Sequence, residues 1–193
     1  LPQSLEKCVC DHNMIEQLDY LPISIIELIC EFNPISLLNN LPPNIERLNC
    51  CNCSILELNN LPPNLKYLDC NTNQIMQLDN LPQNLEILCC CINFIYNLDH
   101  LPPYIKELNC SHNCITKLDN LPIGLKKLEC FNNPKHSSSI VSIIMSFGFT
   151  LLFNKEYAIL RHISTEPKLQ NVKNFIFFDY TYSSYQPLFY YIF

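Results

Sequence analysis

A unit of 20 residues recurs along most of this chain without insertion or deletion. Residues 61–80 read LPPNLKYLDCNTNQIMQLDN, and residues 101–120 read LPPYIKELNCSHNCITKLDN. A unit this short cannot bury its own apolar face, so each copy has to stack on its neighbours. Because the period vanishes after Asn133-Pro134, we expect a repeat domain over residues 1–134, with six full repeats and a partial seventh. The remaining residues, 135–193, form a non-repeat tail or cap. The copies begin at Leu1, Leu21, Leu41, Leu61, Leu81, Leu101 and Leu121.

The repeat positions fall into apolar and polar columns. The consensus is L-P-x-x-L-x-x-L-x-C-x-x-N-x-I-x-x-L-x-x, with exceptions such as Cys8 at position 8 and Cys53 at position 13. Positions 8 and 10 alternate with more polar neighbours, which predicts a short strand with these two side chains facing inward. The Leu-Pro opening removes backbone donors and favours an extended, polyproline-like segment rather than a long helix. The Asn at position 13 can satisfy backbone groups where the strand turns away, and Cys53 should weaken that ladder.

This consensus matches the leucine-rich repeat, whose units run from about 20 to 29 residues. The fold expected is a leucine-rich repeat solenoid with a parallel β-sheet on the concave side, an extended convex side without long helices, and a non-repeat C-terminal cap. The 20-residue frame resembles the bacterial YopM and IpaH class. The Cys at position 10 and the Asp-Asn before Leu-Pro look more like leucine-rich repeat proteins of giant DNA viruses of amoebae, the mimivirus group.

The resemblance to the IpaH class implies a ubiquitin-ligase activity that this sequence does not support. The catalytic part of those ligases is a large separate domain with a nucleophilic Cys. Here only residues 135–193 follow the repeats, and none of them is Cys. We therefore expect no enzyme activity and no cofactor.

Position 10 is Cys in all seven copies, and three explanations compete: disulfides, a metal array and packing. An odd column of side-by-side residues is poorly arranged for disulfides, and paired C-x2-C spacing for zinc is absent. Packing is favoured, because free Cys behaves as a small buried hydrophobe. Free thiols indicate a reducing compartment such as the cytoplasm. A redox or metal role of the outward Cys51, Cys89 and Cys91 stays open.

The outward side chains at positions 7, 9 and 11 form what we call the strand face, the concave side of the solenoid where repeat arrays typically bind partners. These columns vary while the core columns stay fixed, as a binding face or neutral drift would produce. The centre, around Tyr67 and Ile87, is the most apolar part and the expected hot spot. The candidate partner-binding residues are Arg47, Asn49, Cys51, Tyr67, Asp69, Asn71, Ile87, Cys89, Cys91, Glu107 and Asn109.

Charge and composition argue against several classes of function. Residues 1–133 carry 7 basic and 15 acidic residues, so they repel phosphate backbones and nucleic-acid binding is not expected. The five His are scattered, and with only two Gly no Gly-rich phosphate loop is possible. The leading hypothesis is a protein–protein interaction module, and the resemblance to the virus proteins implies a viral–host interaction. The alternatives are a structural or virion component without a defined ligand, or a substrate-binding fragment of a ubiquitin-ligase-type effector.

The tail begins with an uncharged run, residues 140–153, whose length predicts a buried core helix rather than a membrane span. Residues 175–182, FIFFDYTY, read as a strand. An open solenoid end exposes its core and a strand edge, so the tail is expected to cap the last repeat.

Overall fold

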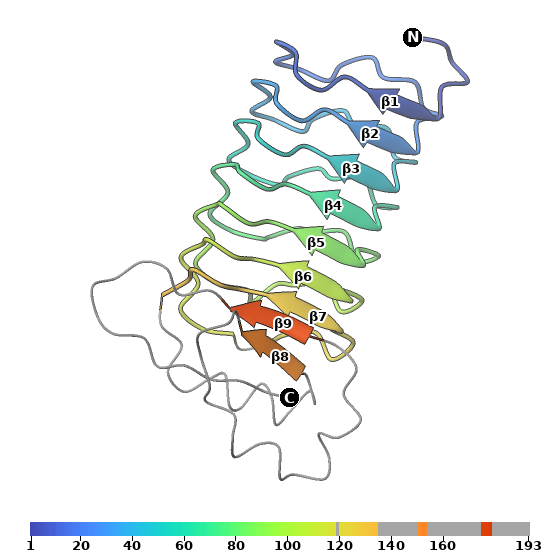
Figure 1. Ribbon diagram of the computed structural model, residues 1–193. Helices are drawn as coiled ribbons and strands as arrows, with labels where there is room; N and C mark the ends of the chain where they lie inside the picture. Colours follow the sequence, from blue (N-terminus) through green and yellow to red (C-terminus); the bar gives the residue numbers. More distant parts are fainter. Residues whose placement is uncertain (119, 135–149, 154–174, 179–193) are drawn as a thin grey trace, which may run out of the picture.

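A computed structural model describes residues 1–118, 120–134, 150–153 and 175–178 of the chain. Seven strands, one per repeat, form a single parallel sheet in sequence order (Figure 1). This arrangement confirms the predicted leucine-rich repeat solenoid. The strands are β1 Lys7–Val9, β2 Glu27–Ile29, β3 Arg47–Asn49, β4 Tyr67–Asp69, β5 Ile87–Cys89, β6 Glu107–Asn109 and β7 Lys127–Glu129.

The register of the sheet follows the repeat without a shift. Every strand residue lies beside the residue 20 positions later, as Leu28 lies beside Leu48 and Leu48 beside Leu68. Hydrogen bonds continue beyond the strand ends, because the amide of Cys50 donates to the carbonyl of Asp69 at 2.8 Å. The middle residue of every strand is buried, as its alternation with more polar neighbours predicted.

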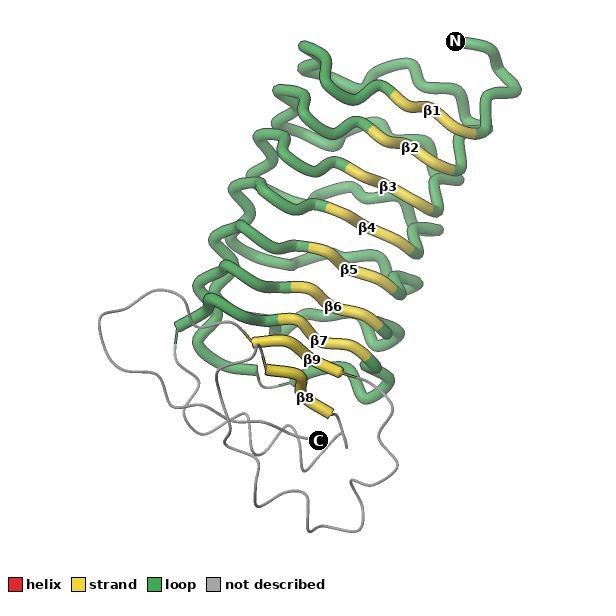
Figure 2. Tube along the Cα trace, in the orientation of Figure 1, coloured by secondary structure: helices red, strands yellow, loops and turns green. Residues whose placement is uncertain are grey.

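Turns and extended segments close each coil behind the sheet, and the described residues contain no helix (Figure 2). None of them therefore provides a helix long and apolar enough to cross a membrane. The apolar columns meet in one continuous core between the sheet and these segments. In the fourth repeat its buried members are Leu61, Leu65, Leu68, Cys70, Ile75 and Leu78.

The Leu-Pro opening is more than an extended outer wall. In every repeat the amide of position 5 donates to the carbonyl of the Pro at position 2, closing a turn, as Leu65 does to Pro62 at 3.2 Å. Pro62 is buried, whereas Pro63 is exposed. The first Pro of the pair therefore belongs to the packed layer, and only the second lines the outside.

An Asn ladder runs along the turn after the strands. Nδ2 of Asn73 lies 3.0 to 3.1 Å from the carbonyls of Cys50, Cys70 and Asn71. Cys53 breaks this ladder as expected, because its thiol reaches the Cys30 carbonyl only at 3.5 Å. Its Asn counterparts accept a hydrogen bond from the amide 18 residues earlier in the chain, at 2.9 to 3.0 Å, whereas the Ile35 amide meets only the weakly accepting thiol of Cys53.

Two further strands lie beyond the repeats. β8, Thr150–Phe153, pairs in parallel with β9, Phe175–Phe178, and β9 lies beside β7 with Cα atoms within 8 Å. The predicted strand at 175–182 is confirmed for its first four residues. The predicted helix over 140–153 is wrong for residues 150–153, where Thr and Phe favour strand pairing. Residues 140–149 and 179–182 lie outside the described residues.

Candidate functional site

The structure brings the predicted binding residues onto adjoining positions of the strand face. Sheet register aligns Arg47, Tyr67, Ile87 and Glu107 as one row of cross-strand neighbours. A second row contains Asn49, Asp69, Cys89 and Asn109. Cys51, Asn71 and Cys91 follow two residues behind this row, at the turn after their strands. All eleven are half-buried or exposed, so this face can touch a partner.

Arg47 and Tyr67 form the best-defined contact on this face. The guanidinium carbon of Arg47 lies 4.2 Å from the centroid of the Tyr67 ring, a cation–π arrangement. Partial burial, with Cys89 and Asp69 nearby, raises the pKa of Tyr67 to about 12, so its hydroxyl stays protonated. The expected apolar centre is therefore half-buried and partly covered by a cation.

Side chains at repeat position 9 also have a structural function, which the sequence did not predict. The side-chain Oδ1 atoms of Asn49, Asp69 and Asn109 each accept a hydrogen bond from the amide two residues later, at 3.0 to 3.2 Å. Cys89 cannot accept in this way, and Oδ1 of Asn71 in the preceding repeat takes the Cys91 amide instead, at 2.7 Å. These candidate binding residues thus also fix the turns that follow β3, β4, β5 and β6.

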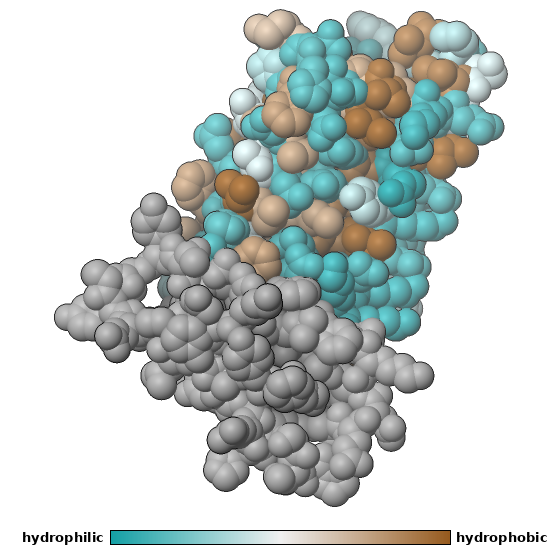
Figure 3. Space-filling model, viewed as in Figure 1, coloured by the Kyte–Doolittle hydropathy of each residue, from teal (hydrophilic) through white to brown (hydrophobic). Residues whose placement is uncertain are grey.

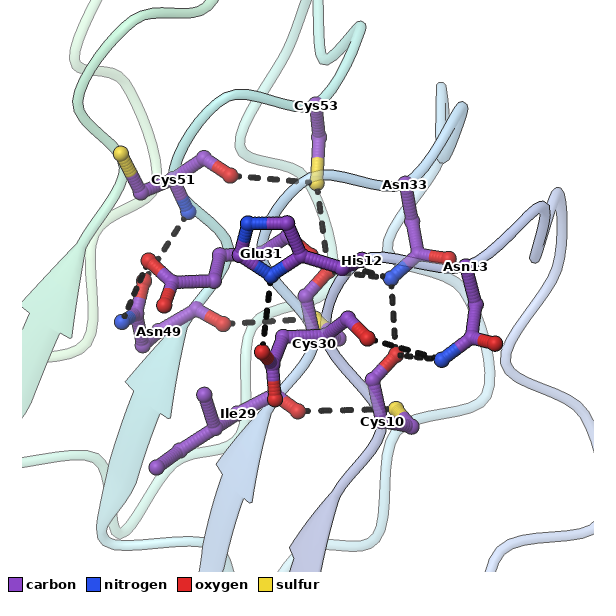
Figure 4. A network of polar contacts seen from close by, with 11 residues as sticks. Cys10, His12, Asn13, Ile29, Cys30, Glu31, Asn33, Asn49, Cys51 and Cys53 are labelled. Atoms are coloured by element: carbon purple, nitrogen blue, oxygen red, sulfur yellow. Dashed lines mark hydrogen bonds and ion pairs between the residues drawn. The ribbon is translucent and has the colours of Figure 1, made fainter.

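A polar network crosses the first three repeats at the end of the strands (Figure 4). Nδ2 of Asn49 donates to Oε2 of Glu31 at 3.3 Å, linking the second and third repeats. Nearby, Asp11 lies 2.8 Å from the His12 ring, and this hydrogen bond lowers the pKa of the Asp11 carboxyl. The network leaves Glu31 without a cationic partner among the described residues.

The outward thiols are poorly suited to redox or metal chemistry. Burial and the Asp69 carboxylate raise the pKa of Cys51 to about 11 and that of Cys89 to about 12, and burial also raises the pKa of Cys91. Reactive cysteines have a lowered pKa, since the thiolate is the nucleophile and the metal ligand. Across the described part of the chain, no group of three or more His, Cys, Asp or Glu could hold a metal ion.

The inward cysteines form a continuous column behind the strand face. All thirteen cysteines are free, and the column is buried except for the half-buried Cys10. The thiols of Cys30, Cys50 and Cys70 each lie 3.4 Å from the position 9 carbonyl of the next repeat, within reach of a weak hydrogen bond. This packing function agrees with the favoured interpretation of the sequence.

Sequence reasoning missed an apolar stripe away from the strand face. Position 16 carries Leu56, Met76 and Tyr96 in three consecutive repeats, and 54%, 60% and 44% of these side chains are exposed. On the side seen in Figure 3, polar surface alternates with separate apolar patches rather than giving way to one apolar area. The three apolar residues at position 16 could have indicated this stripe from the sequence. The repeats on either side carry the polar Ser36 and Thr116 at this position, so the column as a whole does not read as apolar.

Several solved structures of other proteins share the fold of this chain. No protein-family model matches this chain, and no curated protein matches it. Among solved structures, YopM from Yersinia enterocolitica is 36% identical with a TM-score of 0.65, over 69% of this chain and 30% of that one. A functional domain of InlJ from Listeria monocytogenes, described as including a cysteine ladder, is 26% identical with a TM-score of 0.59, over 91% and 44%.

A Shigella effector leucine-rich repeat domain is 21% identical with a TM-score of 0.63, over 90% of this chain and 81% of that one, which is a likeness of fold alone. The matched chain spans less than half the length of the YopM and InlJ structures. These neighbours and the one-strand-per-repeat geometry agree that the repeats of this chain form a leucine-rich repeat solenoid.

Proposed function

We propose that this chain is a protein–protein interaction module that binds its partner through the strand face. The observation that carries the proposal is the contrast between a uniform buried framework and a varied row of cross-strand neighbours. Arg47, Tyr67, Ile87 and Glu107 differ in charge, size and polarity although they occupy the same repeat position. A rigid scaffold with a heterogeneous surface suits recognition of one partner. The leucine-rich repeat neighbours support a binding function rather than a catalytic one.

The setting we propose is the cytoplasm of an amoebal host, with a host protein as the partner. The resemblance of the repeat to those of giant DNA viruses of amoebae supports this setting. The free state of all thirteen cysteines agrees with a reducing compartment. The tail, which places β9 beside β7, is proposed to cap the last repeat.

A quantitative capture experiment tests the strand face. The full chain, immobilised, is incubated with amoebal lysate, and bound proteins are compared by mass spectrometry between the wild type and the double variant Tyr67→Glu with Ile87→Lys. A matched control, Met76→Lys, adds a charge at an exposed position off the strand face. Circular dichroism and thermal unfolding check that the variants fold.

The proposal expects at least one protein that the wild type and the control retain and the double variant loses. If the control loses the same protein and the double variant keeps it, the binding surface lies along the position 16 stripe instead. Capture of no protein by the wild type would favour a structural component without a defined ligand.

A further inference from the structure

Resting on the proposed function above, we infer that the strand face recognises a basic segment of its partner, an extended stretch with Lys or Arg at about every fourth residue. The geometry starts from the carboxylates of this face. Positions 7, 9 and 11 carry six of them in the seven repeats: Asp11, Glu27, Glu31, Asp69, Glu107 and Glu129.

Three of these carboxylates already have a basic partner. Glu27 lies 3.1 Å from the Lys7 ammonium, and Glu129 lies 2.7 Å from that of Lys127. Asp11 contacts His12. Glu31, Asp69 and Glu107 have no ion pair among the described residues.

These three carboxylates lie on one diagonal of the sheet. Glu31 occupies position 11 of the second repeat, Asp69 position 9 of the fourth and Glu107 position 7 of the sixth. Each step crosses two strands and moves two residues along the chain. With ordinary strand spacing and rise, the step is about 12 Å long. Equal steps give a line of negative charge that a single segment can follow.

The cations of the strand face are engaged elsewhere. Lys7 and Lys127 hold their Glu partners, and Arg47 lies over the Tyr67 ring. Lys127 is the cross-strand neighbour of Glu107, but its ammonium pairs with Glu129. No cation from the described part of the chain therefore occupies the diagonal, and a basic group of a partner can do so.

The surroundings of Asp69 agree with this inference. The backbone amide of Asn71 donates to its Oδ1 at 3.1 Å. Burial, and then the charge of Glu31, raises the pKa of the Asp69 carboxyl despite that bond. A cationic group placed over Asp69 would relieve this unfavourable field, and Tyr67 and Ile87 would contact its aliphatic stem.

Charge complementarity and spacing select the occupant. Phosphate-bearing partners are repelled by the diagonal and by the acidic repeats as a whole. In an extended segment, residues four apart point to the same side and lie about 13 Å apart, close to the step of the diagonal. Lys and Arg side chains are long enough to absorb the remaining difference.

Selection from a random peptide library tests the inference without a known partner. Displayed 12-residue peptides are selected on the immobilised full chain, and the affinity of the best peptide is measured by fluorescence anisotropy. The test variant is Glu31→Gln, Asp69→Asn, Glu107→Gln. It keeps the local hydrogen bonds, since Asn already fills the place of Asp69 at Asn49 and Asn109. The control variant Glu6→Gln, Glu16→Gln, Glu57→Gln removes as much charge from exposed positions off the strand face.

We expect enriched peptides with Lys or Arg four residues apart, binding at least tenfold more weakly to the test variant and unchanged to the control. Binding should also weaken between 0.1 and 0.3 M salt. Peptides without basic residues that bind the wild type but not the Tyr67→Glu, Ile87→Lys variant would overturn the basic segment and leave the binding face standing. If no peptide is enriched, the result would count against both the basic segment and the strand face as a binding surface.

Discussion

The backbone amide of Ile55 donates a hydrogen bond to Oδ1 of Asn73, 18 residues further along the chain, at 3.0 Å. Asn73 also donates to the carbonyls of Cys50 and Cys70, so one buried side chain ties its own repeat to the preceding one. The same bonds recur at Asn93 and Asn113. Five of the six repeat junctions therefore depend on an Asn at position 13, and the junction at Cys53 is the exception.

Cys53→Asn should stabilise the solenoid, because it restores the one missing member of this ladder. The new side chain would accept from the Ile35 amide and replace weak thiol contacts to the carbonyls of Cys30 and Cys51. We expect a gain of about 1–2 kcal/mol from the restored bonds, measured by urea denaturation. The reverse change, Asn73→Cys, is the matched control and should destabilise. Equal stability of wild type and Cys53→Asn would contradict the importance of the ladder.

Ile92→Asn should also stabilise the chain, for a reason that lies in the backbone. Position 12 has a positive φ in every repeat, and Ile92 adopts φ 56° although its branched side chain disfavours that region. Asn tolerates it better, and Ile92 is half exposed, so little buried apolar surface is lost. A gain of about 1 kcal/mol is expected. Asn52→Ile, at φ 50°, makes the opposite change and should lower the melting temperature.

The sequence predicted the scaffold well because the fold is made of columns. The 20-residue period has no insertion or deletion, so every repeat position has the same environment in each copy. Leu48, Cys50 and Ile55 could therefore be assigned to the core from periodicity alone. The turn closed by the Pro62 carbonyl, the positive φ at Ile92 and the switch of acceptor from Cys89 to Asn71 were not predicted. They depend on three-dimensional hydrogen-bond geometry that letter spacing does not encode.

The strand face could be located but not described from sequence. Its outward positions follow from strand alternation, whereas the cation–π contact of Arg47 with Tyr67 depends on rotamers. The exposed stripe at position 16 was missed because only three of its copies are apolar. The predicted helix is wrong at Thr150–Phe153 because a short apolar run has no clear period, and its pairing with β9 is not visible in the sequence.

Asp69→Asn should raise stability at neutral pH and remove part of its pH dependence. The pKa of Asp69 is raised from 3.8 on folding, chiefly by burial, so between pH 3.8 and its folded pKa the folded chain binds more protons than the unfolded chain. The contribution of Asp69 to the free energy of unfolding therefore falls as pH rises through the folded pKa. Asn keeps the hydrogen bond from Asn71 without the charge.

The measurement compares urea denaturation of wild type and Asp69→Asn between pH 3 and 7. The free energy of unfolding of the variant should increase relative to that of the wild type as pH increases. Asp11→Asn provides a control of opposite sign, because the hydrogen bond from His12 lowers the pKa of Asp11. A difference between wild type and Asp69→Asn that does not change with pH would contradict the burial argument.

Thiol reactivity should separate Cys114 from the other twelve cysteines. Cys114 alone is exposed, whereas burial raises the pKa of Cys51 to about 11 and of Cys89 to about 12. Ellman's reagent at pH 8 should modify one thiol quickly and the remainder slowly, because only the thiolate reacts. Cys114→Ser should abolish the fast phase. A fast phase that survives in this variant would reveal a reactive thiol elsewhere and reopen a redox function of the strand face.

Cys70→Leu should destabilise the solenoid even though Leu is the more apolar residue. Cys70 is fully buried, and its thiol lies 3.4 Å from the Cys89 carbonyl, between Cys50 and Cys90 in the column. A larger side chain overfills this space at a cost of about 1–3 kcal/mol, and Cys70→Ala should cost about 1 kcal/mol through lost contacts. Cys114→Leu, at an exposed position, should leave the urea midpoint unchanged. If Cys70→Leu were as stable as the wild type, the column would have room for Leu. Size would then not explain why all seven repeats carry Cys at position 10.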